Sequence, residues 1–465
     1  MAEIAAGAWA AEEVVSTGVQ AGVAAYMVSQ PTMPLKGTFT QIASAPDDET
    51  RASLARSNHS LTIVGDKAFI FGGETGESQL ATTEIHVISL LSSEELEKQG
   101  ESQYALLPAL PAGSTGGEAP AASEDDSNSV PVARTRHAAC AFNVCVAVFS
   151  GRDAQGDAID EKGRIWLFNT AKSTWEFIGP KLGEQEVPEP RTEGKLFDCN
   201  NDLVLHGGFG KTGEPLKDTW HFSYANKTWT RLPDAPQANT NASLATGVLW
   251  LLVIGPDTDG LSGYVHALPI SSAINPSSPS AWTTRSFPTN PLVSSPEPRV
   301  AGGLLPMTTG HGRHYLLHFF GASPSGAESK SAQEPSASDS SAAATESQPA
   351  ASSEPTQYPD LWTLQLPSVT PGRKASWSET LRPAAIKDSI RSAFKADTGT
   401  DAWAEVDIQP PALEKLGDGE AGKVHPGPRA SFGCDVLKDG ATIMIWGGVN
   451  AKGEREGDGW LVKLE

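Results

Sequence analysis

Cysteine is scarce in this chain, and the few cysteines are not arranged for metal binding or redox chemistry. The 465 residues include only four, at Cys140, Cys145, Cys199 and Cys434, and none belongs to a Cys-x-x-Cys pair. Structural zinc sites and thioredoxin-like motifs use closely spaced pairs of that kind. We therefore expect free thiols, buried or partly buried, in a reducing compartment.

Basic charge is also lacking, both overall and at the N-terminus. The net charge is −21, from 35 basic against 56 acidic residues, which argues against binding to nucleic acid or to an anionic membrane surface. Glu3, Glu12 and Glu13 stand where a secretory signal or a mitochondrial presequence carries basic residues. We predict a cytoplasmic protein, with the nucleus as the alternative.

No stretch has the pattern of a transmembrane helix, and the common catalytic motifs are missing. Residues 14–35 carry no charge, but glycine and proline interrupt them. We expect an Ala-rich, helical extension over residues 1–35. The sequence has neither a Gly-Lys-Ser/Thr phosphate loop nor a Gly-x-Ser-x-Gly nucleophile elbow. We predict no catalytic residue and no cofactor.

Glycine is abundant, and it marks an internal repeat. Six segments end an apolar run at small residues, a spacing typical of repeat architectures. Three of them end at Gly72-Gly73, Gly207-Gly208 and Gly447-Gly448, and three at Ser150-Gly151, Gly255-Pro256 and Gly321-Ala322. Two successive small residues allow neighbouring strands to approach closely and the backbone to take a positive φ.

Two aromatic columns follow each glycine pair. The first lies in a short apolar strand and consists of Ile85, Trp166, Trp220, Tyr264, Trp362 and Trp460. The second opens the next strand and consists of Tyr104, Trp175, Trp229, Trp282 and Trp403. Asp218, Asp360 and Asp458 each precede the first column by two positions. We expect the aromatic side chains to fill contacts between neighbouring units.

An arginine precedes the apolar run in five of the six units. These residues are Arg56, Arg136, Arg191, Arg299 and Arg429, whereas the fourth unit has Gln237 and Asn239 nearby. Each unit then comprises four short strands, and arranging such sheets radially buries both faces of each. The pattern predicts an all-β, six-bladed propeller with four-stranded blades, in which the fourth blade is the most irregular.

These columns resemble the kelch repeat, which is also found in the central domain of galactose oxidase. The resemblance covers the chain from about Thr38 to Glu465, and it implies an intracellular kelch-type propeller over residues 36–465. Because the chain ends on the third strand of the last unit, residues 37–43 are the expected outer strand. Phe39 would stand there in the tryptophan position, and this strand would close the ring.

Three insertions interrupt the repeat, at about residues 92–130, 323–356 and 374–401. The second is rich in Ser, Ala, Glu and Pro and is expected to be disordered. The third contains Ile386, Ile390 and Phe394 at helical spacing, which predicts a short amphipathic helix. Its apolar stripe is expected to pack on the propeller, with docking of a partner as the alternative.

The arginine column provides the main functional hypothesis. In the propellers that this chain resembles, the inner strand starts near one rim of the central channel, where peptides dock. The five arginines would form a partial basic ring that binds carboxylates or phosphates bidentately. Alternatively, each pairs with an acid or a carbonyl of its own repeat. We predict a monomeric scaffold for a protein partner, with an acidic or phosphorylated peptide as one candidate.

A metal site is the alternative hypothesis. Glu214, Asp218 and His221 are similar to the iron-holding Glu-x-x-x-Asp-x-x-x-His run of nitrile-specifier proteins. Here Asp218 and His221 are one residue too close, which on a strand puts the histidine on the opposite face. A second candidate combines His311, His314 and His318. A metal-dependent or small-molecule-binding propeller enzyme is therefore retained as the alternative function.

Overall fold

The structure is a computed structural model, and it describes most of the chain. The described residues are 32–42, 52–92, 95–96, 98, 102–113, 130–180, 185–238, 241–257, 260–270, 281–287, 295–309, 312–324, 356–368, 382–393, 398–410 and 424–465. Nearly all of the predicted N-terminal extension lies outside these residues. So does most of the insertion at 323–356 that was expected to be disordered, together with much of the insertion at 92–130.

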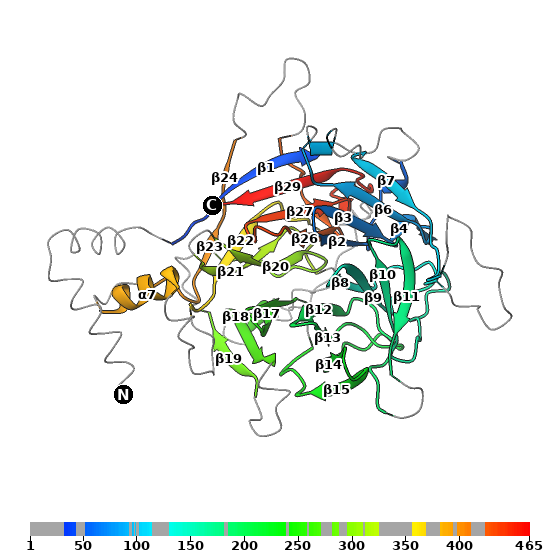
Figure 1. The fold of residues 1–465 in the computed structure, drawn as a ribbon. Coiled ribbons are helices and arrows are strands. Elements are labelled where there is room, and N and C mark those ends of the chain that lie inside the picture. The colour runs from blue at the N-terminus through cyan, green and yellow to red at the C-terminus, as the bar shows by residue number, and fades with distance from the viewer. Residues whose placement is uncertain are drawn as a thin grey trace, which may run out of the picture.

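Six sheets, antiparallel except for one parallel pair in the sixth, are arranged as blades around a common axis, with their first strands innermost (Figure 1). Blade 1 comprises β2 (Ser60–Val64), β3 (Lys67–Phe71), β6 (Ile85–Ser89) and β7 (Tyr104–Leu107). Blade 2 comprises β8 (Ala138–Phe142), β9 (Cys145–Phe149), β10 (Ile165–Asn169) and β11 (Thr174–Ile178). Blade 3 comprises β12 (Lys195–Cys199), β13 (Asp202–His206), β14 (Thr219–Ser223) and β15 (Thr228–Leu232).

The remaining three blades complete the predicted six-bladed propeller. Blade 4 comprises β16 (Ala242–Ala245), β17 (Val248–Asp257), β18 (Gly260–Pro269) and β19 (Thr283–Ser286). Blade 5 comprises β20 (Gly303–Thr308), β21 (His314–Phe319), β22 (Leu361–Gln365) and β23 (Trp403–Glu405). Blade 6 comprises β26 (Gly433–Val436), β27 (Thr442–Trp446), β29 (Gly459–Leu464), β1 (Lys36–Ile42) and β24 (Asp407–Gln409). Two short ladders accompany them, β4 (Glu74–Gly76) with β5 (Gln79–Leu80) and β25 (Arg429–Ala430) with β28 (Val449–Asn450).

The ring closes through β1, as the sequence predicted. This strand pairs antiparallel with β29, where Phe39 lies opposite Val462, and it pairs in parallel with β24. The Phe39 side chain is buried and meets the Trp460 ring edge-on at 6.3 Å between centroids. Segments from both ends of the chain thus share one sheet, and the outer edge of β29 is covered.

Apolar side chains gather between the blades, and each of the six junctions holds one hydrophobic cluster. The aromatic columns supply much of it. Seven of the eight tryptophans expected there are buried, and Trp282 of blade 4 is half-buried; the buried ones are Trp166, Trp175, Trp220, Trp229, Trp362, Trp403 and Trp460. A four-stranded sheet presents two apolar faces, and the radial arrangement buries both against neighbours.

The glycine pairs allow neighbouring blades to approach each other. Gly72 and Gly73 have φ of 63° and 91°. A Cβ on Gly72 would lie 2.5 Å from the Arg134 carbonyl oxygen of blade 2, so only glycine fits there. In blade 5 the pair is Phe320-Gly321, with φ of 52° and 93°, and not Gly321-Ala322 as predicted.

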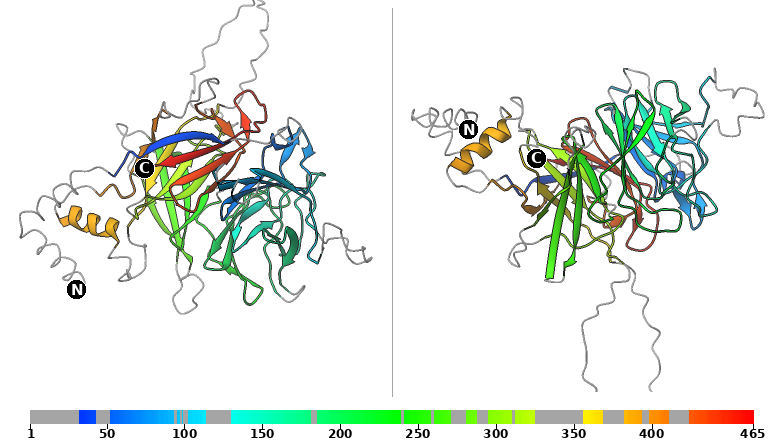
Figure 2. Two further views of the ribbon diagram at one scale, coloured as in Figure 1. Left: turned by 45° about the horizontal axis from the view of Figure 1, so that its top comes forward. Right: turned by 90° about the horizontal axis from the view of Figure 1, so that it is seen from below.

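Blade 4 departs most from the common pattern. Its β17 and β18 are ten residues each and form a long continuous hairpin (Figure 2). Strand register aligns the glycine pair of other blades with Val253 and Ile254, and the first aromatic column with His266. The predicted assignments, Gly255-Pro256 and Tyr264, are therefore displaced by two residues. In blade 1 the same comparison replaces Ile85 with His86, because the preceding loop has one extra residue.

The insertion at 374–401 contains helix α7 (Pro383–Ala393). Its buried face consists of Ala384, Ala385, Asp388 and Arg391, and Asp388 pairs with the buried Arg313 at 2.6 Å. Ile386 is 42% exposed. The expected packing is therefore wrong for Ile386, because a buried ion pair anchors the opposite face of the helix; Ile390 is half-buried, and Phe394 lies outside the described residues.

Candidate functional site

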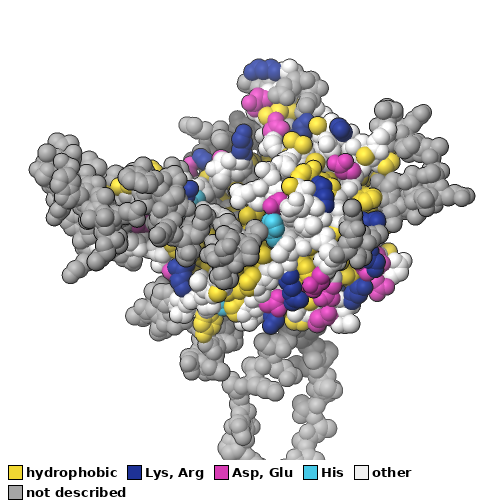
Figure 3. All heavy atoms as spheres, turned by 60° about the horizontal axis from the view of Figure 1, so that its bottom comes forward, with side chains coloured by type: hydrophobic (Ala, Val, Ile, Leu, Met, Phe, Trp, Pro, Cys, Tyr) yellow, Lys and Arg dark blue, Asp and Glu magenta, His cyan; other side chains and the backbone are white. Residues whose placement is uncertain are grey.

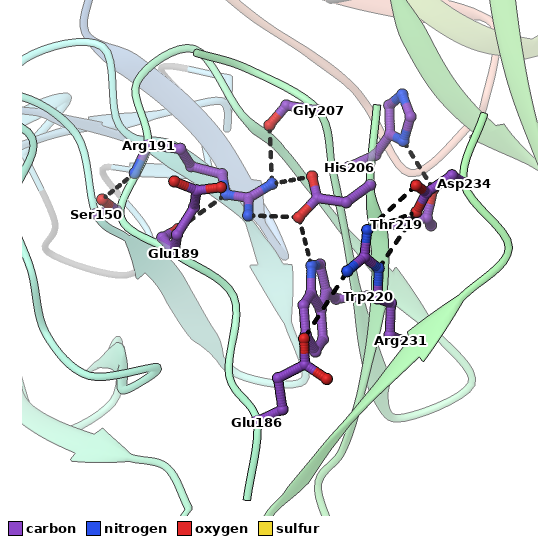
Figure 4. A network of polar contacts seen from close by, with 11 residues as sticks. Ser150, Glu186, Glu189, Arg191, His206, Gly207, Thr219, Trp220, Arg231 and Asp234 are labelled. Carbon is purple, nitrogen blue, oxygen red and sulfur yellow. Dashed lines mark hydrogen bonds and ion pairs between the residues drawn. The ribbon is translucent and has the colours of Figure 1, made fainter. Parts of the chain in front are cut away.

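A polar network fills the interior of blade 3 beside the glycine pair (Figure 4). Both terminal nitrogens of Arg191 donate to the Asp218 carboxylate, at 2.7 and 2.8 Å. The arginine also donates to the Gly207 carbonyl at 3.1 Å, and the indole N–H of Trp220 donates to Asp218 at 2.6 Å. Arg191 is only 1% exposed, so this guanidinium binds the interior of its own blade.

The same network recurs in three other blades. The equivalent trios are Arg134, Glu161 and Trp166; Arg299, Asp360 and Trp362; and Arg429, Asp458 and Trp460. In each, the arginine and the indole N–H share one carboxylate. Each arginine also donates to the carbonyl at the first position of its glycine pair. The repeat thus joins its inner strand, its glycine turn and its third strand through one buried ion pair.

Electrostatics keep these buried carboxylates ionised. Burial by itself raises the pKa of Asp218, but the hydrogen bonds from Arg191 and Trp220 and the arginine charge outweigh burial. The pKa of Asp218 therefore lies below its ordinary value. The same holds for Asp360. Burial raises its pKa, but the hydrogen bonds from Arg299 and Trp362 outweigh burial, so its pKa is also lowered. A folded-state pKa below the unfolded one means that this stabilisation is lost as the pH falls through the folded value.

A second feature surrounds the axis where the inner strands begin, and we call it the axial ring. It consists of Asn58, Arg136, Glu193, Ala301 and Ser431, each two residues after the buried arginine of its blade. All five have a left-handed backbone, with φ between 52° and 58°, although none is glycine. Backbone hydrogen bonds of 2.7–3.0 Å link successive members: Ser431 to Ala301, Asn58 to Ser431, Arg136 to Asn58, and Glu193 to Arg136.

The side chains of the axial ring reach the surface, unlike the arginines that precede them. Every member is half-buried or exposed. Arg136 and Glu193 form an ion pair between blades 2 and 3, with side chains that are 35% and 34% exposed. The Nε of Arg136 is covered and has no hydrogen-bond partner. The ring therefore presents unlike side chains on one repeated backbone.

Four of the five arginines expected at a rim do not line one. Arg56, Arg191, Arg299 and Arg429 are buried and hydrogen-bonded within their own blades. They cannot bind a partner from inside the sheets, so the predicted exposed ring of these arginines is wrong. Arg136 alone reaches the surface, because the structural arginine of blade 2 is Arg134, which the sequence analysis missed.

The residues of the metal hypothesis have separate partners. Asp218 is held by Arg191 and Trp220, His221 contacts Asp202 at 3.1 Å, and the exposed Glu214 bonds to Thr212. His314 contacts Thr308, whereas His318 contacts the Gly303 carbonyl. His311 lies outside the described residues. Among the described side chains, no group of three or more His, Cys, Asp or Glu is placed to hold a metal.

The four cysteines are free thiols, two of them buried and two half-buried. Burial raises the pKa of Cys199 to about 11 and that of Cys434 to about 12, which keeps both protonated and poorly nucleophilic. On the face shown in Figure 3, the described basic and acidic side chains lie interspersed. Within the described ranges, no helix is long and apolar enough to cross a membrane.

Comparison with known proteins finds distant relatives. No family model matches the chain. It is 25% identical over 206 residues to N-(sulfonatooxy)prop-2-enimidothioate sulfolyase of Thlaspi arvense, covering 42% of this chain and 51% of that one. It is 22% identical over 206 residues to an F-box/kelch-repeat protein of Arabidopsis thaliana, covering 42% and 37%. The alignment with the flagellar outer-arm dynein alpha chain of Chlamydomonas reinhardtii, 22% identical over 220 residues, covers 46% and 4%.

The chain thus spans about half or less of the length of these relatives. Among solved structures, YjhT superposes with a TM-score of 0.50 at 12% identity, covering 88% of this chain and 97% of that chain. At that identity the likeness is one of fold.

Proposed function

We propose that this chain, a six-bladed β-propeller of the kelch type, acts inside the cell as a scaffold that binds a protein partner at the axial ring. One observation carries the proposal. Five non-glycine residues at equivalent positions keep a left-handed backbone, which costs a residue with a side chain about 1 kcal/mol. The shared conformation holds a different side chain of each blade at an equivalent place around the axis, which supports the use of the ring as a rigid recognition surface.

The charges on the ring indicate how a partner is recognised. Arg136 and Glu193 are the ionic members, and their half-exposed pair sits between two blades. A planar guanidinium that uses one nitrogen for Glu193 can also bind a carboxylate or phosphate of the partner. The four free thiols are consistent with a reducing compartment.

Affinity purification with mass spectrometry tests the scaffold. The double variant Arg136→Gln/Glu193→Gln removes both ring charges and keeps a polar side chain at each position. The matched control is Arg231→Gln/Asp234→Asn, which neutralises an exposed ion pair on the outer part of blade 3. We expect partners captured by the wild type and the control to be lost from the ring variant. Equal capture by all three proteins would contradict binding at the ring.

An enzymatic role is the second candidate, because a relative at 25% identity is named as a sulfolyase. In this chain Asp218 is committed to Arg191, so a metal would have to break that ion pair. Metal analysis of the purified chain separates the two functions. Stoichiometric iron that disappears in a Glu214→Ala variant would favour the enzyme.

A further inference from the structure

Helix α7 has two faces, and the propeller holds one of them. The buried face carries Asp388, which pairs with Arg313 of blade 5 at 2.6 Å. Ile386 and Ile390 lie one turn apart on the opposite side of the helix, since an α-helix has about 3.6 residues per turn. Ile386 is 42% exposed, and Ile390 is half-buried. An apolar stripe on the side away from the anchor is typical of a surface on which another segment docks.

Positive charge borders this stripe. Arg382 stands just before the helix and Lys387 follows Ile386, and both side chains are half-buried. The one acidic residue of the helix, Asp388, is paired with Arg313 on the other face. We call Arg382, Ile386, Lys387 and Ile390 the outer face of α7. Its combination of apolar and basic side chains, on a chain with a net charge of −21, favours an apolar and acidic segment.

The described part of the chain begins beside this helix. The Tyr315 hydroxyl donates to the Thr32 carbonyl at 2.9 Å. Burial raises the pKa of Tyr315 to about 12, and the charges of Asp388 and Arg391 act on it as well, so this hydroxyl lies near the buried face of α7. A Cβ on Gly399 would lie 2.8 Å from the Thr32 hydroxyl. In Figures 1 and 2 the helix projects from the ring next to the start of β1. Residues before Thr32 therefore start on the side of the propeller that carries α7.

The sequence before Thr32 has the composition that the outer face favours. Residues 1–31 contain no Lys or Arg, and their three charges are glutamates. These glutamates share residues 3–15 with the large apolar side chains Ile4, Trp9, Val14 and Val15, and their positions are Glu3, Glu12 and Glu13. The uncharged residues 16–31 can span up to roughly 50 Å when extended, whereas α7 is about 16 Å long. Residues 3–15 can therefore reach the outer face.

We propose that residues 3–15 dock on the outer face of α7 in the same chain, with their apolar side chains over Ile386 and Ile390 and their glutamates against Arg382 and Lys387. A tether that starts at Thr32, beside the helix, gives this segment a high effective concentration compared with a second copy or another protein. The contact lies on blade 5 and does not involve the axial ring.

Paramagnetic relaxation in the full chain tests the proposal. A nitroxide is attached to Ser389→Cys, at an exposed position of α7, and the indole ¹H–¹⁵N signals are recorded, with a Trp9→Phe variant to assign the signal of Trp9. We expect the Trp9 signal to lose most of its intensity. The same label on Ala171→Cys, at an exposed turn of blade 2, should leave that signal unchanged, and the wild-type chain treated with the reagent controls for the native thiols. No loss from Ser389→Cys, or an equal loss from both labels, would overturn the proposal.

A charge exchange tests the chemistry of the contact. Adding Lys387→Glu to the labelled Ser389→Cys chain should restore the Trp9 signal, and adding Glu12→Lys/Glu13→Lys to that variant should bring the loss back. The melting temperature checks that Arg313 and Asp388 still anchor the helix. A loss that persists in Lys387→Glu would overturn the charge contact. Loss of the Trp9 signal when a ¹⁵N chain without nitroxide is mixed with an unenriched chain that carries it would assign the segment to a second copy, and would overturn docking within one chain.

Discussion

Blades 3 and 4 are neighbours in the ring, and they are joined to the rest of the propeller by different means. Blade 3 has the buried trio of Arg191, Asp218 and Trp220, and Gly151 of blade 2 donates its N–H to the Arg191 carbonyl at 3.0 Å. The same inter-blade bond links Gly73 to Arg134, Gly321 to Arg429 and Gly448 to Arg56. The links of the axial ring run across the same four junctions.

Blade 4 has none of these devices in the described part of the chain. Gln237, Val253 and His266 replace the arginine, the first glycine and the tryptophan, and no described residue of blade 4 takes part in the glycine-to-arginine-carbonyl bond. The axial-ring position of this blade lies outside the described residues. Its apolar clusters and its long hairpin remain. Apolar burial thus suffices to pack a blade into the ring, while the inter-blade hydrogen bonds oppose its separation from its neighbours. Among the described residues, four junctions have the glycine-to-carbonyl bond and the two junctions of blade 4 lack it; we call the former linked and the latter unlinked. The unlinked junctions are crossed nearer the outside, by the Trp282–Pro233 hydrogen bond and the Arg285–Asp401 ion pair.

The largest effect is expected from removing a buried arginine of a linked blade. Arg191→Met leaves Asp218 buried without its cation, which should cost about 3–5 kcal/mol of unfolding free energy. The control Arg231→Met breaks an exposed pair and should cost less than about 1 kcal/mol. Urea denaturation of both variants measures the difference. Equal midpoints would mean that the buried trio does not stabilise the blade.

The closing strand should rank next. Phe39→Ala empties a buried site against Trp460 and should cost about 3 kcal/mol, whereas Phe177→Ala removes a side chain that is 46% exposed and should cost about 1 kcal/mol or less. Thermal unfolding compares the two. If β1 did not contribute to closing the ring, Phe39→Ala would have the melting temperature of the wild type.

A glycine of a linked junction should give a smaller effect. Gly72 and Gly65 have similar φ, 63° and 66°, but a Cβ would lie 2.5 Å from the Arg134 carbonyl oxygen of blade 2 at Gly72 and has no neighbour within 4 Å at Gly65. Both alanine variants carry the backbone penalty of about 1 kcal/mol, and Gly72→Ala adds a clash worth about 1–2 kcal/mol more. Denaturation midpoints give the difference, which would vanish if the blades did not pack closely there.

The smallest effect concerns pH. Burial raises the pKa of Asp435 to about 6, and its carboxylate accepts the Ile63 N–H of the next blade at 2.7 Å. Because an unfolded aspartate titrates near 3.9, the contribution of Asp435 to native stability is complete below about pH 4 and is lost as the pH rises through about 6. Asp435→Asn keeps the acceptor and cannot ionise, so at pH 7.5 it should exceed the wild type by roughly 2 kcal/mol. Urea unfolding at pH 4.5 and 7.5 measures this difference, with Asp234→Asn as the control. If the unfolding free energy of Asp435→Asn changed with pH as much as that of the wild type, the assignment to Asp435 would be refuted.

The fold could be predicted from the sequence because tight turns and inter-blade contacts leave glycine and aromatic residues at regular spacing. The predicted positions within the glycine, aromatic and arginine columns were wrong by one or two residues where the loops between strands differ in length. Arg136 was taken for Arg134, although Arg134 and Ser150 are 16 residues apart, as are Arg56 and Gly72. That equal separation was the available signal.

The axial ring could not be predicted in the same way. Its members have unlike side chains, and what they share is a backbone conformation and a hydrogen bond to the neighbouring blade. The missing arginine of blade 4 was visible in the sequence, where Gln237 stands at its position. The equivalence of His266 and His86 became apparent only from strand register.

Native-state hydrogen exchange by mass spectrometry tests most directly whether blade 4 is joined to the ring by fewer links. The account predicts that amides of β16 and β17 exchange at least tenfold faster than those of β12 and β13 in blade 3, since fewer polar links oppose local opening. Equal protection of the two inner hairpins would contradict the division of the ring into linked and unlinked junctions.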